Sequence, residues 1–190
     1  LYNRALSATE IAALYRSGQI TLRQASNQGL VGYWPMNEAR GQQAGDSSGN
    51  GKTGTLTSMD AATDWVNGKR GKALDFDGVD DMVNLGDNFD FVSQSFTVCG
   101  WAKPTTGGYA DGYLAGKYDG GTNNGWFIRI ISGIWNTGIT SADLIAGGTA
   151  DINIWQHICS VFVPTPGTAI VYKNGVQTNS TTGQTAMADN

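Results

Sequence analysis

The chain has 190 residues, enough for one domain with a single hydrophobic core and an additional arm or tail. Its formal net charge is −4 and no cluster of lysine and arginine occurs, which argues against nucleic acid or an anionic membrane surface as a partner. No apolar run approaches the roughly 20 residues needed to cross a bilayer, so we expect no membrane insertion.

The first predicted element is a short helix close to the start of the chain. Ser7 and Glu10 form an S-x-x-E capping box, in which each side chain satisfies a backbone N–H of the first turn. Gly18 is placed to end the helix in a left-handed conformation. The predicted helix therefore has both a start signal and a stop signal.

One side of this helix is apolar. Leu6 and Ile11 have the spacing of a hydrophobic staple, and Ile11, Leu14 and Tyr15 form one stripe at positions i, i+3 and i+4. Such a stripe has to pack against another surface. We therefore predict that Leu6, Ile11, Leu14 and Tyr15 form an interface, either within the chain or with another chain.

After the helix, residues 19–28 are polar and are predicted to be a linker. Short apolar or alternating segments then recur every eight to twelve residues, and Asn174–Gly175 is a favoured hairpin turn. No second helical pattern occurs, so the fold class predicted is an all-β antiparallel sandwich. The main predicted strands lie in the segments 29–38, 72–76, 81–86, 94–104, 112–119, 125–133, 154–163 and 169–178.

The two cysteines, Cys99 and Cys159, both fall inside predicted strands. They are either two small buried hydrophobic residues or a disulfide that joins two strands. A bond closing a loop of this length would stabilise the fold by roughly 3–4 kcal/mol. A zinc site is not expected, because the cysteines are far apart and the chain has a single histidine.

Several segments together resemble the laminin-G-like, concanavalin A-like jelly roll. They are, in order, GLVGYWPMNEARGQQAGDSSGNGKTGTL, GKRGKALDFDGVDDMVNLG, SFTVCGWAKP, WQHICSVFV and VYKNGVQT, and they run from about Gly29 to the C-terminus. The resemblance implies two antiparallel sheets packed face to face. It also implies an extracellular or cell-surface location, because the family consists of secreted and surface-attached modules.

The opening helix is similar to the end of a domain in this family, where the last strand runs into a capped helix. Here the segment YNRALSATEIAALY stands before the first strand of the domain instead. We therefore expect residues 1–18 to be the helical tail of a preceding repeat or a docking arm. Residues 19–28 would be a linker, and residues 29–190 would form a sandwich that lacks its final strands.

Two loops have the composition of a calcium site, since Ca²⁺ takes oxygen ligands from carboxylates, amides and carbonyls. The first contains Asp46 and Asn50, and the second contains Asp77 and Asp80, followed by Asp81. The resemblance supports calcium, because many laminin-G-like modules hold this ion at a loop edge. The alternative is that these side chains form Asx-turns without an ion.

Carbohydrate binding requires exposed aromatic rings with polar groups nearby. Tyr109, Tyr113 and Trp135 are the candidate ligand contacts, whereas Trp126 and Trp155 are predicted to lie in the core. The superfamily also includes glucanases, but hydrolysis needs two carboxylates across the scissile bond. The chain has two glutamates only: Glu10 belongs to the helix cap, and Glu38 has no acidic partner nearby. The aspartates at positions 75, 77, 80 and 81 could supply a carboxylate pair, but aspartate in such a turn is more often turn chemistry, so we expect no enzyme.

These observations favour a non-catalytic adhesion or carbohydrate-binding module of an extracellular tandem-repeat protein, with a glycan or a surface protein as its partner. The alternative is a structural subunit of a surface filament or matrix. In that alternative the N-terminal arm is donated between neighbouring repeats or identical chains. A glycoside hydrolase-related enzyme ranks third.

Overall fold

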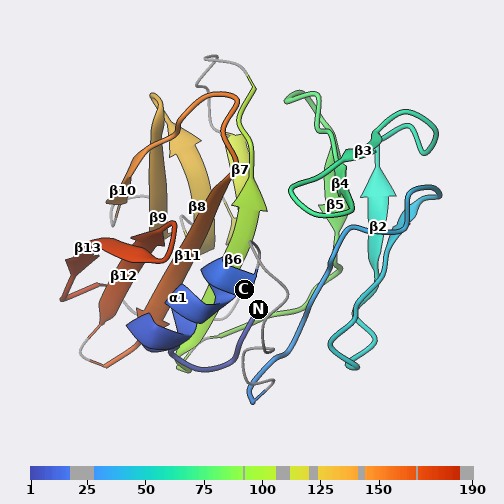
Figure 1. Ribbon diagram of the computed structural model, residues 1–190. Helices are drawn as coiled ribbons and strands as arrows, with labels where there is room; N and C mark the ends of the chain where they lie inside the picture. Colours follow the sequence, from blue (N-terminus) through green and yellow to red (C-terminus); the bar gives the residue numbers. More distant parts are fainter. Residues whose placement is uncertain are drawn as a thin grey trace. The chain divides into compact units, whose positions relative to one another are not determined.

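A computed structural model describes residues 1–17, 28–91, 93–105, 112–119, 124–140, 144–165 and 167–184. The described strands pair antiparallel, and α1 accompanies them, so the prediction of an all-β fold with a short helix near the start of the chain is confirmed (Figure 1). The elements are α1 (Ala8–Ser17), β1 (Gln43–Ala44), β2 (Gly54–Thr57), β3 (Trp65–Asn67), β4 (Lys72–Leu74), β5 (Met82–Asn84), β6 (Phe96–Ala102), β7 (Gly112–Asp119), β8 (Asn124–Ile131), β9 (Ile134–Thr140), β10 (Ile145–Thr149), β11 (Gln156–Val163), β12 (Thr168–Lys173) and β13 (Val176–Thr181).

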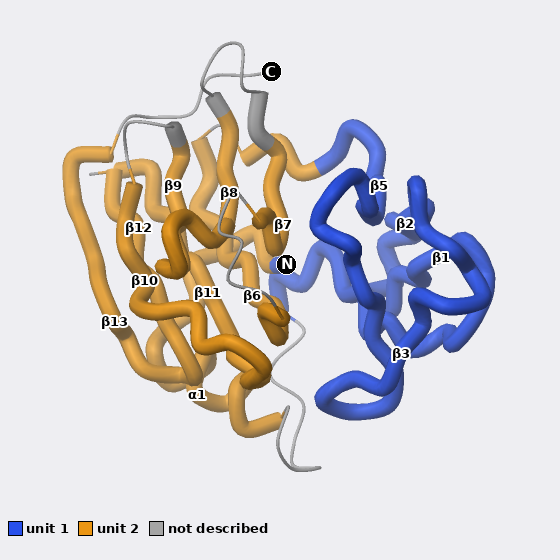
Figure 2. Tube along the Cα trace, turned by 90° about the horizontal axis from the view of Figure 1, so that it is seen from above, with its two compact units in different colours: residues 1, 27–88 blue, residues 2–26, 89–190 orange. Residues whose placement is uncertain are grey.

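The chain forms two compact units (Figure 2). Unit 1 contains residue 1 and residues 27–88, and unit 2 contains residues 2–26 and 89–190. We define residues 2–17 as the N-terminal arm. The arm therefore belongs to unit 2, together with residues 89–190.

Unit 1 consists of a three-stranded sheet in the order β1-β2-β5 and the β3–β4 hairpin. A small cluster of buried side chains forms its core, and partly buried hydrophobic residues pack around it. The buried members are Ala44, Leu56, Met59 and Trp65, and the surrounding ones are Trp34, Met36, Leu74 and Val83.

The strand predicted within residues 29–38 is wrong. The backbone N–H of Tyr33 donates to the Asp46 carboxylate (3.0 Å) rather than to a neighbouring strand. Met36 has a φ of 52°, which an extended strand does not allow. The apolar residues of this segment are explained by packing, because Trp34 and Met36 lie against the unit 1 core.

Unit 2 contains two four-stranded sheets, which lie face to face (Figure 1). Sheet I has the order β13-β12-β11-β6 and sheet II has the order β10-β9-β8-β7. Aromatic rings from both sheets meet between them. The ring centroid of Phe96 lies 4.6 Å from that of Phe162, also in sheet I, and 5.8 Å from that of Trp126 in sheet II. This arrangement is the predicted sandwich, and it confirms that Trp126 is a core residue.

Helix α1 begins as its sequence predicts. The Ser7 N–H and hydroxyl both donate to the Glu10 carboxylate (2.9 and 2.8 Å), and the Glu10 N–H donates to the Ser7 hydroxyl oxygen (3.3 Å). Arg4 adds a second partner, because its guanidinium lies 2.6 Å from the same carboxylate. These hydrogen bonds confirm the capping box and lower the pKa of Glu10 to about 2.

The arm docks on the outer face of sheet I, the face directed away from sheet II. Tyr2 pairs with Thr97 at the free edge of β6. The Thr97 hydroxyl, which is fully buried, accepts the Leu6 N–H (3.0 Å) and donates to the Arg4 carbonyl (2.8 Å). One threonine therefore satisfies two backbone groups of the arm.

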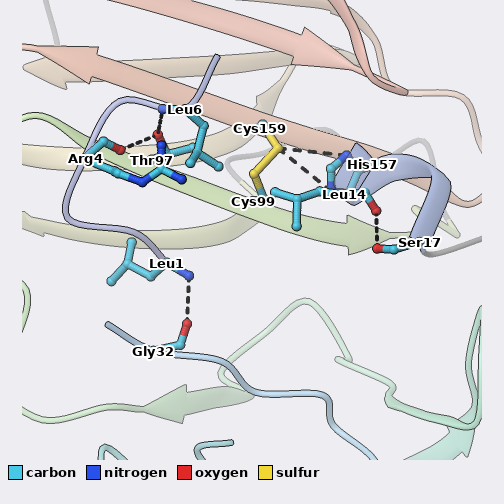
Figure 3. The surroundings of a disulfide bond; sticks show 10 residues. All are labelled: Leu1, Arg4, Leu6, Leu14, Ser17, Gly32, Thr97, Cys99, His157 and Cys159. Carbon is cyan, nitrogen blue, oxygen red and sulfur yellow. Dashed lines mark hydrogen bonds between the residues drawn. A yellow bond between two sulfur atoms is a disulfide. The ribbon is translucent and has the colours of Figure 1, made fainter. Parts of the chain in front are cut away.

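The apolar stripe of α1 packs against its own chain. Ile11 is fully buried, and the Tyr15 ring stacks on Trp101 with 5.6 Å between centroids. Gly175 in the β12–β13 turn lies under the helix, where an added Cβ would come within 3.1 Å of the Tyr15 side chain. Leu14 lies beside the disulfide (Figure 3).

Cys99 and Cys159 are directly opposite each other on β6 and β11, and their sulfur atoms are bonded (2.03 Å; Figure 3). Of the two alternatives that the sequence left open, the structure contains the disulfide. The bond lies on the outer face of sheet I, under α1, and Cys159 is fully buried.

Replacing Ile11 by alanine should lower the free energy of unfolding of unit 2 by about 2–5 kcal/mol, because it removes a fully buried side chain from the α1 interface. The measurement is urea unfolding. The matched control is Thr9→Ala on the exposed side of the same helix, with an expected change within about 0.5 kcal/mol. Equal effects of the two variants would contradict the docking of α1.

The double variant Cys99→Ala/Cys159→Ala should lose about 3–4 kcal/mol of stability, because the bond closes a loop of 60 residues. Urea unfolding of the variant and of the chemically reduced protein should agree. As a direct check, the urea-unfolded, unreduced chain should take up no alkylating reagent. Labelling of both cysteines under those conditions would show that the bond is absent.

Candidate functional site

The strongest candidate for a ligand site is a group of side chains on the outer face of sheet II. We call it the Tyr113 patch and define it as Tyr113, Phe127, Arg129 and Asn136. Tyr113 is 49% exposed, whereas Phe127 is buried beside it. The patch therefore presents an accessible aromatic ring on a packed base.

The strand register brings these residues together. Tyr113 of β7 is directly opposite Arg129 of β8, and Arg129 is opposite Asn136 of β9. The Trp126 ring meets Phe96 between the two sheets, so Phe127 and Arg129, which alternate with Trp126 along β8, point outward. Gly116 allows the close approach of β7, since an added Cβ would lie 3.3 Å from the Phe127 Cβ.

Arg129 fixes the position of the tyrosine ring. Its guanidinium carbon lies 4.6 Å from the centre of the Phe127 ring, and its Nη1 donates to the Tyr113 hydroxyl (2.9 Å). Tyr113 and Phe127 also meet edge to face, with 6.2 Å between ring centres. These contacts immobilise the exposed ring before any ligand arrives.

The patch can make both kinds of contact that a sugar offers. The exposed ring of Tyr113 provides an apolar surface for sugar C–H groups. Its phenol accepts from Arg129 and still has its own proton to donate to a ligand hydroxyl. Arg129, Phe127 and Asn136 are not among the residues predicted from the sequence, although the alternation of Phe127 and Arg129 with Trp126 and Ile128 along β8 is a usable signal.

The other two predicted sugar contacts have different outcomes. Trp135 is wrong as a ligand contact, because it is only 2% exposed and points into the core. Its indole N–H donates to the Gln156 side chain (3.0 Å), which satisfies the polar atom of the ring inside the sandwich. Tyr109 lies outside the described residues.

Asp46 and Asn50 organise a loop of unit 1. Asp46 accepts the N–H groups of Tyr33, Ser48 and Lys52 and the Ser48 hydroxyl, at 2.8–3.0 Å. Burial alone would raise the pKa of Asp46, but these hydrogen bonds outweigh it and lower the pKa to about 2. The Asn50 amide donates to the Leu30 carbonyl (3.2 Å). Both oxygens of Asp46 therefore already accept hydrogen bonds of a turn, and calcium at this pair stays a prediction.

The second predicted metal loop brings three carboxylates together. Ligand oxygens of Asp77, Asp80 and Asp81 lie within 4.8 Å of one another, and Asp77 and Asp80 are exposed. Asp77 accepts the Val79 N–H (2.8 Å) and Asp81 accepts the Asp77 N–H (2.9 Å), each through one oxygen. The remaining oxygens can face a cation, so this turn fits a calcium ion better than the Asp46 loop does.

Cys99, His157 and Cys159 also lie within metal-binding distance of one another. The two sulfur atoms are bonded to each other, so neither is available as a thiolate ligand. The imidazole is buried, and burial lowers its pKa to about 4. This cluster is structural.

In the part of the chain that the structure describes, no helix combines the length and hydropathy that a membrane crossing needs. A search of curated proteins finds no match to the chain. The family model described as the concanavalin A-like lectin/glucanases superfamily matches residues 77–190, which include the described strands of both sandwich sheets. At the family level, this match supports a carbohydrate-binding or adhesion-type module. The chain belongs to the concanavalin A-like lectin/glucanases superfamily.

Proposed function

We propose that this protein is a non-catalytic, extracellular carbohydrate-binding module and that the Tyr113 patch is its glycan contact. The observation that carries the proposal is the half-exposed Tyr113 ring, which is held in place by Arg129 on a buried Phe127. An exposed aromatic ring with restricted motion loses little entropy when a ligand stacks on it. Its position within the region matched by the family model also supports the proposal.

In this proposal the ring of Tyr113 stacks on the apolar face of a sugar, and its phenol donates to a sugar hydroxyl. Arg129 acts as a positioning residue, since its guanidinium accounts for the orientation of the ring through a hydrogen bond of 2.9 Å. The buried Phe127 supplies the surface on which Arg129 rests. Binding would need no rearrangement of the sheet.

The surroundings of the two glutamates support a non-catalytic function. Glu10 is engaged by Ser7 and Arg4 at the helix cap, and Glu38 accepts the Gly45 N–H (2.8 Å). Glycoside hydrolysis needs one carboxyl group to protonate the leaving oxygen and a second one across the scissile bond. The disulfide supports an extracellular location, because such bonds persist in oxidising compartments.

The docked arm favours the binding module over the filament alternative. Donation between chains requires an apolar stripe that is available to a partner. Here Ile11 and Leu6 are already buried against sheet I of the same chain. We therefore place assembly through the arm second.

Tyr113→Ala should weaken glycan binding about tenfold or more, equivalent to about 1.4 kcal/mol, because it removes the stacking surface. A glycan array identifies the ligand, and calorimetry with that glycan measures the affinities. Arg129→Gln should weaken binding less, since it removes the support of the ring and keeps the ring itself.

The matched control is Tyr33→Ala, which removes an equally exposed tyrosine (52%) from unit 1. Its affinity should equal that of the unaltered protein. A loss as large as that of Tyr113→Ala would place the glycan contact elsewhere, and the absence of any bound glycan on the array would contradict the proposed function itself.

We also propose that the acidic turn of Asp77, Asp80 and Asp81 holds calcium. Millimolar Ca²⁺ should raise the Tm more than Mg²⁺ does, because Ca²⁺ accepts a flexible set of six to eight oxygens. Asp80→Asn should abolish the difference, whereas Glu38→Gln, which changes a carboxylate outside the turn, should keep it. Identical Tm values in Ca²⁺ and in chelator would show that the three carboxylates only shape the turn.

A further inference from the structure

His157 occupies an unusual position for a titratable group. It lies on the outer face of sheet I and is only 3% exposed. Its ring is 5.2 Å from the Trp101 ring and 6.1 Å from the Tyr15 ring of α1, measured between centroids. Both ring nitrogens lie 3.9 Å from the sulfur of Cys159 (Figure 3).

The surroundings of the imidazole contain no carboxylate among the described residues that face it. α1 contributes the neutral phenol of Tyr15, β6 contributes an indole, and the disulfide closes the third side. Asn174 of the β12–β13 turn binds only the His157 main chain, through its side-chain oxygen (3.0 Å) and its own N–H (2.8 Å). A proton on the ring would therefore be a buried charge with weak acceptors.

The charged residues on the neighbouring elements are engaged elsewhere or face solvent. Lys173 of β12 binds Asp151 (2.8 Å) and the Thr149 carbonyl (2.6 Å). Arg16 of α1 is exposed. The Arg4–Glu10 pair lies at the start of α1, where each charge compensates the other.

We propose that the N-terminal arm is an acid-released latch, in which protonation of His157 beneath Tyr15 drives α1 off the outer face of sheet I. Release lets water reach the charged imidazole. It also uncovers Trp101 and the disulfide. This inference does not rest on the glycan site, which lies on the other sheet of the sandwich.

The pH range follows from the two states of the histidine. Above pH 6.5 the imidazole is neutral whether α1 is docked or released. Burial lowers the pKa of docked His157 from 6.5 to about 4, so between these values only the released form takes up a proton. The ratio of released to docked α1 then rises by up to tenfold per pH unit, about 300-fold in total. Below about pH 4 both forms are protonated and the ratio stays constant.

Glu10 cannot cause the same transition in this range. Its hydrogen bonds with Arg4 and Ser7 lower its pKa to about 2, so it remains ionised until well below pH 4. The cap of α1 is therefore intact at the pH at which His157 begins to titrate. Release at that pH would move a capped helix away from the sheet.

The experiment uses the full chain at several pH values from 7 to 4.5. Because the chain has one histidine, its imidazole resonance in the NMR spectrum is unambiguous. Hydrogen exchange, corrected for the intrinsic rate at each pH, reports the opening of residues 8–17. We expect the histidine to titrate well below pH 6.5 and the opening constant of α1 to rise about 60-fold. Residues 124–131 of β8 should keep their protection.

Two variants separate the latch from general acid sensitivity. His157→Phe preserves an aromatic ring but cannot take up a proton. In this variant the opening constant of α1 should therefore rise less than about threefold between pH 7 and pH 4.5. Glu10→Gln is the matched control, because it weakens the helix cap and leaves His157 in place. It should raise the opening constant of α1 at every pH and retain its dependence on pH.

Four outcomes would overturn the proposal. They are a histidine that titrates near pH 6.5 while α1 stays protected, α1 protection that does not change with pH, equal acid sensitivity of His157→Phe, and loss of β8 protection together with α1. The first, second and fourth are measured on the unaltered protein, so the proposal stays testable even if His157→Phe does not fold.

Discussion

Strand β11 is buried on both of its faces, and much of unit 2 follows from that constraint. Phe162 points toward sheet II, whereas His157 and Cys159 point to the opposite side and are also buried. An antiparallel sheet normally exposes one face to water, so a second apolar face needs a cover. The N-terminal arm is that cover. Its Ile11 and Tyr15 lie over a floor of Trp101, His157 and the disulfide.

The same cover explains why chemically active groups are inert here. Bonding removes both thiols, and burial suppresses the basicity of His157. A cluster that has the ligand types of a metal site is therefore a packing layer between a helix and a sheet. The proposed acid-released latch depends on this layer, because an imidazole with no charged partner among the described residues destabilises its cover once it takes up a proton.

Sheet I has its outer face occupied by the arm, so a ligand surface on unit 2 is more readily found on sheet II. On the outer face of sheet II, the side chains differ in their exposure to solvent. Tyr113 is half exposed, while Arg129 and Phe127 hold it from beneath. The proposed glycan contact and the proposed latch therefore use opposite outer faces of one sandwich. Each face can be altered without removing residues of the other.

Local patterns in the sequence determined the capped helix, the all-β class and the strands of sheet I, because these depend on neighbours a few positions apart. The S-x-x-E box at Ser7 is one example, and the alternation along β6 is another. Strands β9 and β10 were not predicted, since glycines interrupt their alternation. Only the tertiary structure decided what depends on distant partners: the burial of Trp135 against Gln156, the pairing of Cys99 with Cys159, and the use of Asp46 as a backbone acceptor. The composition of a loop or strand is the same whether its polar and aromatic groups face solvent, an ion or the core. Which of these surroundings a group has depends on the residues that the tertiary structure brings next to it from distant parts of the chain.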